Sequence, residues 1–180
     1  MGAVRTATWG LITLCAAVGL YVFALPPIGD VTERWQTGNG VFNIRIDQRA
    51  EDLWLFGLPG AYYVFQSSHS EGPWREVMTF RHDDPVPIPR ENIRFVNDRI
   101  AFVFMGWMFA ITTDGGNKWS TWNAQTDLPK WDCCNYRLIK DVNILPSGTG
   151  TMTLEVIEDR SGEEVPLLKT TDFGRHWAPS

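Results

Sequence analysis

Two short stretches of the chain contain side chains that could do chemistry. In the first, His82, Asp83 and Asp84 are consecutive, and a histidine beside two carboxylates could hold a metal ion or act as an acid–base pair. Consecutive residues in a segment that continues with Pro85 rarely converge on one ion. The simpler interpretation of this stretch is therefore a solvated loop.

In the second stretch, Cys133 and Cys134, two of the three cysteines, are adjacent. No pair of cysteines has the Cys-x-x-Cys spacing of a metal site. Because neighbouring cysteines seldom meet disulfide geometry, two packed thiols are the simpler interpretation and a strained disulfide is the alternative. The sequence suggests no histidine or asparagine partner for a nucleophilic thiol. We therefore expect no metal, no cofactor and no catalytic residue.

A long connection at residues 123–138 is the preferred candidate for a binding surface. It contains Lys130, Trp131, Tyr136 and Arg137, which are of the anchor types found at protein interfaces. In repeat proteins such insertions form loops on one face, which is often the binding face. The alternative is a loop that covers the core, with Trp131 buried.

Internal repeats indicate the scaffold that positions these segments. The pattern Thr-x-Asp-x-Gly-x-x-Trp ends at Trp119 and again at Trp177, and a shorter, weaker copy ends at Trp74. The spacings between these tryptophans are 45 and 58 residues, so the third repeat is longer, and its extra length is the connection described above. The two complete copies consist of Thr112, Asp114, Gly116 and Trp119, and of Thr170, Asp172, Gly174 and Trp177.

Each residue type in this motif suits a tight turn between two antiparallel strands. The aspartate can accept hydrogen bonds from backbone N–H groups a few residues further on. The glycine supplies a positive φ, the threonine hydroxyl can close a second local bond, and the tryptophan covers the hairpin. We therefore expect Asp114 and Asp172 to hold turns, with His69 and His176 exposed in these turns.

The segments before each motif alternate between apolar and polar residues and are separated by Gly, Pro and Asn, as is typical of β-strands. In the first repeat the expected strands are 41–48, 52–60 and 61–68, and in the second repeat the run 104–109 predicts a buried strand pair. No long helical period follows Pro27. The sequence predicts an all-β domain with about twelve strands in three four-stranded units.

Residues 33–37 look like a strand that follows a motif tryptophan. We expect them to pair with the last hairpin and close the domain as a monomer, since an unpaired edge invites aggregation. A half-propeller completed by a second copy is the alternative.

The motif resembles the Asp-box, or BNR, repeat of sialidases, sortilin-like receptors and photosystem assembly factors, over roughly residues 41–180. In those families the repeat usually forms one blade of a β-propeller, so the resemblance implies a small propeller-like or sandwich-like domain. Sialidases use an arginine cluster, a tyrosine nucleophile paired with a glutamate, and an acidic proton donor. Here Arg90 is not in the Arg-Ile-Pro order of that family, and no Tyr–Glu arrangement is recognisable. The resemblance implies a hairpin design rather than this activity.

The N-terminal segment, residues 1–27, is expected to be a membrane anchor. Residues 7–25 contain no charged side chain and as a helix would extend about 28 Å, the lower range for spanning a bilayer. Arg5 precedes this run, so the positive-inside rule places the β domain, residues 28–180, outside the cytoplasm, in the periplasm if the protein is bacterial. The alternatives are a signal peptide cleaved after Ala24, a lipoprotein signal, or a buried soluble helix.

Charge and architecture together indicate a class of function. The formal net charge of -5 argues against binding to nucleic acid, which requires a basic footprint. The sequence predicts a non-catalytic, membrane-anchored module that binds a protein partner outside the cytoplasm, such as a periplasmic immunity or inhibitor protein or an assembly factor. The alternatives are a carbohydrate-binding or sialidase-like protein that acts on glycans, and a structural component of the envelope.

Overall fold

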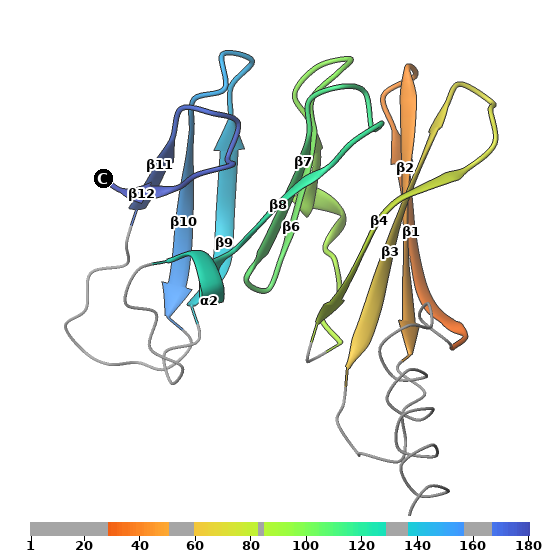
Figure 1. Ribbon diagram of the computed structural model, residues 1–180, viewed down its shortest axis with the longest axis horizontal. Helices are drawn as coiled ribbons and strands as arrows, with labels where there is room; N and C mark the ends of the chain where they lie inside the picture. Colours follow the sequence, from red (N-terminus) through yellow and green to blue (C-terminus); the bar gives the residue numbers. More distant parts are fainter. Residues whose placement is uncertain (1–28, 51–59, 83–84, 129–136, 157–166) are drawn as a thin grey trace, which may run out of the picture.

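The computed structural model of the chain describes residues 29–50, 60–82, 85–128, 137–156 and 167–180. Its strands form three four-stranded antiparallel sheets, which stand side by side in Figure 1. The prediction of three four-stranded units in an all-β domain is confirmed. We name them sheets A, B and C in chain order.

Sheet A consists of β1 (Val31–Gly38), β2 (Phe42–Ala50), β3 (Ala61–His69) and β4 (Arg75–His82). Sheet B consists of β5 (Ile93–Phe95), β6 (Ala101–Met105), β7 (Met108–Thr112) and β8 (Ser120–Asn123), with the short 3-10 helix η2 (Arg90–Asn92) before it and the one-turn helix α2 (Ala124–Asp127) after it. Sheet C consists of β9 (Arg137–Ile144), β10 (Gly150–Val156), β11 (Leu167–Thr170) and β12 (Ala178–Pro179). Strands that are consecutive in the chain are neighbours in every sheet.

The first strand overturns the expected closure of the domain. The sequence predicts that residues 33–37 pair with the last hairpin, but they lie in β1, which pairs with β2. The side-chain oxygen of Asn39 accepts hydrogen bonds from the N–H groups of Val41 and Phe42, both at 3.0 Å, and forms a tight turn between these strands. Closing this short loop costs less chain entropy than pairing across the whole domain.

The other strands of the first repeat are assigned accordingly. Residues 52–59 of the predicted strand 52–60 lie outside the described residues, and β2 pairs directly with β3. The predicted strands 41–48 and 61–68 correspond to β2 and β3 and are confirmed. At the other end of the chain β12 pairs with β11, so the two ends of the domain belong to different sheets.

Sheet B is buried on both faces because successive residues of its strands point alternately to sheet A and sheet C. In β6, Ala101 and Val103 pack into the core between sheets A and B, whereas Phe102 and Phe104 pack into the core between sheets B and C. Every residue of β6 and β7 is buried, which confirms the predicted buried strand pair at 104–109.

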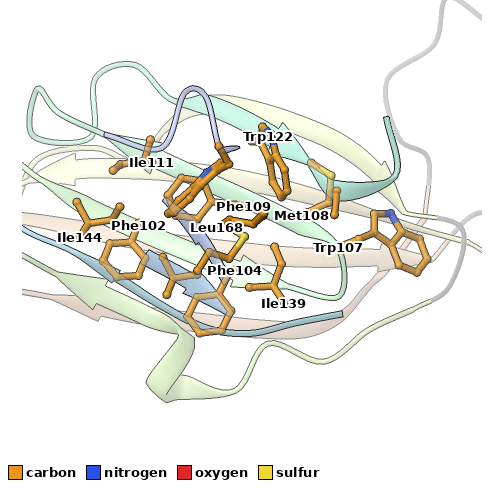
Figure 2. Close-up of a cluster of buried hydrophobic side chains, with 14 of the residues drawn as sticks. Phe102, Phe104, Trp107, Met108, Phe109, Ile111, Trp122, Ile139, Ile144 and Leu168 are labelled. Atoms are coloured by element: carbon orange, nitrogen blue, oxygen red, sulfur yellow. The ribbon is translucent and has the colours of Figure 1, made fainter. Parts of the chain in front are cut away.

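The two cores differ in which sheet supplies the large side chains. Between sheets A and B, small residues of sheet B face aromatic residues of sheet A, such as Phe42 and Phe65. Between sheets B and C most of the aromatic residues come from sheet B, and Trp177 comes from the turn of sheet C. Figure 2 shows this second core, in which Phe102, Phe104 and Phe109 of sheet B lie together with Ile144 and Leu168 of sheet C. This complementarity of size allows both interfaces to pack closely.

The two ends of the stack of sheets carry different connections. Tight turns link β1 to β2, β3 to β4, β5 to β6, β7 to β8, β9 to β10 and β11 to β12 at one end, which we call the turn end (Figure 1, top). The strand ends that flank residues 51–59, 83–84, 129–136 and 157–166 lie at the other end, which we call the loop end. β1 also begins at the loop end.

In the part of the chain that the structure describes, no helix has the length and apolar character to cross a bilayer, and the predicted segment 7–25 lies outside that part.

Candidate functional site

The two complete motifs form the same network of hydrogen bonds at the turn end. In the turn after β7, the hydroxyl of Thr112 donates to the carboxylate of Asp114 at 3.0 Å and accepts from the N–H of Gly116 at 2.9 Å. In the turn after β11, the equivalent bonds made by Thr170 are 2.8 and 3.0 Å long. These are the local bonds that the sequence leads us to expect.

The aspartate carboxylates bind the backbone that follows them. Asp114 accepts a hydrogen bond from the N–H of Lys118 at 2.9 Å, and Asp172 accepts one from the N–H of His176 at 3.1 Å. The second carboxylate oxygen of Asp172 lies 2.5 Å from Nδ1 of His176. Partial burial raises the pKa of both carboxyl groups, but the hydrogen bonds outweigh it, so the pKa of Asp114 is lowered and that of Asp172 falls to about 2. His69 and His176 are exposed, as predicted.

We expect Asp172→Asn to lower the free energy of unfolding by about 1 kcal/mol near neutral pH, because the amide weakens the local bonds. Since the folded-state pKa of Asp172 is lowered to about 2, the carboxylate stabilises the fold above its ordinary pKa, and this contribution is lost as the pH falls through about 2. The difference between variant and parent should therefore shrink between about pH 5 and pH 2. Urea unfolding at a series of pH values measures it, with the exposed Asp98→Asn as a control that changes little. A difference that stays constant with pH would contradict this role.

The motif turns also connect neighbouring sheets, which the sequence analysis does not anticipate. Trp119, at the end of the turn of sheet B, packs edge-on against Phe65 of sheet A, with ring centroids 5.4 Å apart. Trp177, at the end of the turn of sheet C, packs in the same way against Phe109 of sheet B, at 5.6 Å. In Figure 1 both turns lean toward the preceding sheet. Each tryptophan therefore covers the sheet before its own.

The motif glycines make this close approach possible. A Cβ atom at Gly116 would lie 3.0 Å from atoms of Phe42 and Ser67 in sheet A, and one at Gly174 would lie 2.6 Å from the ring of Phe109 in sheet B. Both glycines also have positive φ, +86° and +75°. Glycine is therefore required at these positions both for the turn and for the contact between sheets.

The weaker copy of the motif ends on the outer side of sheet A, which no sheet precedes in the part of the chain that the structure describes. Trp74 is partly exposed, and the guanidinium carbon of Arg45 lies 4.6 Å from the centre of its ring. The side chain of Arg45 belongs to the side of sheet A that points away from sheet B. The turn between β3 and β4 leans outward in Figure 1, in the same direction in which the other two turns lean.

This outer side of sheet A carries a group of charged residues. In β2, Ile44 and Ile46 point into the core with sheet B, so the residues that alternate with them point away. Residues that stand opposite one another in antiparallel strands share a face, and the register places partners from β1, β3 and β4 on this outer side. We call this side the arginine face after its four arginines, Arg34, Arg45, Arg49 and Arg81.

Asp47 lies within the arginine face and organises it. Its side chain is 1% exposed and accepts two hydrogen bonds from Arg34, at 2.6 and 2.9 Å. Burial raises the pKa of Asp47, but the bonds to Arg34 and the charges of Arg45 and Arg49 outweigh burial, so the pKa lies below its usual value. Among the residues that the structure describes, the register adds one more carboxylate to this side, that of Glu76, so four arginines face two acids there.

Sequence reasoning missed the arginine face, although a signal for it exists. Arg45, Asp47 and Arg49 alternate with apolar or buried residues along β2, which places three charges on one side of a strand. The formal net charge of -5 concealed this local excess of positive charge.

The interpretation of His82 as part of a solvated loop is wrong. His82 is the last residue of β4, is 2% exposed, and stacks on Trp107 with ring centroids 4.0 Å apart. It continues the inward-pointing row of β4 that includes Phe80, a period-two pattern that was visible in the sequence. Asp83 and Asp84 lie outside the described residues. Among the residues that the structure does describe, no group of three or more His, Cys, Asp or Glu side chains could hold a metal ion.

The predicted contact residues Lys130, Trp131 and Tyr136 lie outside the described part of the chain, as do Cys133 and Cys134. For the predicted residue Arg137 the structure gives the backbone, at the start of β9. Comparisons of the chain with protein families, with curated proteins and with solved structures find no match in any of the three.

Proposed function

We propose that this chain is a non-catalytic interaction module that is anchored in a membrane by residues 7–25 and binds a protein partner outside the cytoplasm. An inhibitor of a secreted toxin and an assembly factor are concrete members of this class. The single observation that carries the proposal is the arginine face, which lies on the outer side of sheet A.

The arginine face combines side chains that are effective at protein interfaces. Arginine and tryptophan are the residue types most enriched among the residues that dominate binding energy, and Arg45 and Trp74 are stacked here in one unit. Bonds to Asp47 and Gln66 hold Arg34 and Arg45 in place, so little side-chain entropy remains to be lost on binding. The excess of positive charge favours a protein surface that carries carboxylates.

The insertion that contains Lys130, Trp131, Tyr136 and Arg137 remains a proposed second contact. It connects α2 to β9 at the loop end of the stack, which is also where β1 begins. This contact would lie on the side of the domain nearest to the proposed anchor.

Site-specific photo-crosslinking in intact cells tests the proposal. Gln36 is exposed on the outer side of sheet A, opposite Arg45, and is a suitable position for a photoreactive amino acid. We expect a covalent adduct with a protein. We also expect Arg45→Gln combined with Arg81→Gln to reduce its yield about tenfold or more, because the variant removes charges that attract a carboxylate-bearing surface.

A matched control is Arg99→Gln, which removes an exposed arginine from the turn between β5 and β6 and should leave the adduct unchanged. An adduct formed with glycan alone, or a yield that does not respond to loss of the two arginines, would contradict a protein-binding arginine face.

A further inference from the structure

The three sheets are held together by one type of joint that occurs twice. Trp119 packs on Phe65, and Trp177 packs on Phe109. Phe65 and Phe109 hold the same position in their repeats, three residues before the hydroxyl residue of the motif, and each points toward the following sheet. In each joint the tryptophan of a motif turn, which we call the turn half, packs on an aromatic residue of the preceding sheet. We call the residue at that position of a repeat the face half.

Among the described residues, one half of the joint is left without its counterpart at each end of the stack. Trp74, the tryptophan of the first motif copy, lies on the outer side of sheet A beside Arg45. Leu167, three residues before Thr170, is the counterpart of Phe65 and Phe109 in sheet C. It is 40% exposed, whereas its neighbour Leu168 is fully buried against sheet B, so Leu167 points outward.

The surroundings of Leu167 suit a contact with the outer side of sheet A. Four large hydrophobic side chains are exposed among the described residues, and Leu167 and Leu145 of sheet C are two of them. Leu145 and Lys169 line a shallow hollow at the turn end of sheet C, the end at which the motif turns sit on sheets A and B. The register puts Glu155 and Lys169 on this side, and Asp141 beside them binds Arg94 of sheet B at 2.7 Å.

We propose that two copies of the chain associate head to tail, with Trp74 of each copy packed on Leu167 of the other. This inference rests on the proposed function, because it names a second copy as the protein partner of the arginine face. Two such joints would close a ring of six sheets, which is within the usual range of four to eight blades in propellers, whereas three sheets fall short of it. A head-to-tail contact forms a closed ring when its rotation allows closure.

The direction of the internal joints is compatible with membrane anchoring of both copies. In one copy the strand ends of sheets A, B and C that flank the long connections all lie at the loop end. If the joint between two copies has the same geometry as the joints between sheets within one copy, the sheets of both copies point their loop ends in the same direction. The loop ends of both copies, where β1 begins, would therefore face the same side of the ring and the same membrane.

Sedimentation velocity of the full-length protein in detergent tests the proposal. We expect the parent chain to form dimers at high concentration. Trp74→Ala, which removes the turn half, and Leu167→Gln, which removes the face half, should each raise the dissociation constant about tenfold or more, because each damages both joints of the ring. Val41→Gln changes another exposed hydrophobic residue and should leave the dimer intact. Thermal unfolding should show all variants folded, since the changed side chains are partly or largely exposed.

Mixing the two defective variants tests the head-to-tail geometry. In a mixed pair, Trp74 of the Leu167→Gln copy meets Leu167 of the Trp74→Ala copy, so one joint is intact. We therefore expect the mixture to form heterodimers more strongly than either variant forms homodimers. A monomeric parent chain, a dimer that survives Trp74→Ala, or a mixture that stays monomeric would each overturn the proposal.

Failure of the self-association proposal can be distinguished from failure of the proposed function. If the parent chain is monomeric but the photo-crosslink at Gln36 still yields an arginine-dependent adduct with another protein, the interaction module stands and self-association falls. If the adduct at Gln36 joins two copies of the chain, both proposals are supported.

Discussion

Gly174→Ala should lower the free energy of unfolding by about 3 kcal/mol, the largest effect that we expect from adding a single methyl group to this fold. Part of the loss comes from the positive φ of +75°, which costs a residue with a Cβ atom about 1–2 kcal/mol. The rest comes from overpacking, because the new Cβ would lie 2.6 Å from the ring of Phe109, which is fully buried and cannot move without disturbing the core. Urea unfolding followed by circular dichroism measures the loss.

Gly40→Ala is a matched control for this substitution. Gly40 also has a positive φ, +89°, but a Cβ there would meet no atom within 4 Å. The control should therefore show the backbone cost alone, about 1–2 kcal/mol. Equal losses in the two variants would mean that the motif glycine serves its own turn and does not mediate contact between sheets B and C.

Asp47→Asn should lower the free energy of unfolding by about 2 kcal/mol. The carboxylate is 1% exposed and carries the negative charge that Arg34, Arg45 and Arg49 surround. Removing one partner of a buried ion pair costs about 3–5 kcal/mol, and we expect less here because Arg34 is 50% exposed and can turn to water. Denaturant unfolding near neutral pH measures this loss, which should decrease at higher salt as the repulsion between the arginines is screened.

Glu76→Gln provides the comparison on the same side of sheet A. Glu76 is exposed and accepts a hydrogen bond from Thr79 at 2.8 Å, so its neutralisation should change stability by less than about 0.5 kcal/mol. If Asp47→Asn were as mild as Glu76→Gln, the arginine face would not depend on its buried carboxylate for its structure.

Local features of the fold were predictable from the sequence because they depend on neighbouring residues. The alternation in residues 61–68 predicted β3, and the Thr-x-Asp-x-Gly spacing predicted the hydrogen bonds of Thr112 and Thr170. Pairing between distant segments was harder. Residues 33–37 have the same strand pattern whichever partner they take, and the partner was decided by the short turn at Asn39.

The surfaces that carry the proposals depend on how whole sheets stack, which a single strand pattern does not reveal. Charges at residues 45, 47 and 49 indicate a common side of a strand, but only the position of sheet A at the end of the stack leaves that side without a described sheet over it. Leu167 has an apolar side chain like Phe65 and Phe109, and its exposure follows from the lack of a described sheet beyond sheet C. In the sequence, Phe65, Phe109 and Leu167 occupy equivalent positions of the three repeats, and the arrangement of the sheets decides which of them are buried.

The joint between a motif turn and the preceding sheet is the central claim, and a double-mutant cycle between Gly174→Ala and Phe109→Leu tests it most directly. Leucine lacks the ring atoms Cε1 and Cζ of Phe109, which a Cβ at Gly174 would approach to 2.6 and 2.9 Å. We predict that Gly174→Ala costs about 1–2 kcal/mol less in the leucine background than in the parent chain, because the overpacking is relieved and the backbone cost remains. Equal losses in the two backgrounds would show that the turn and the sheet are not coupled, and would contradict the joint.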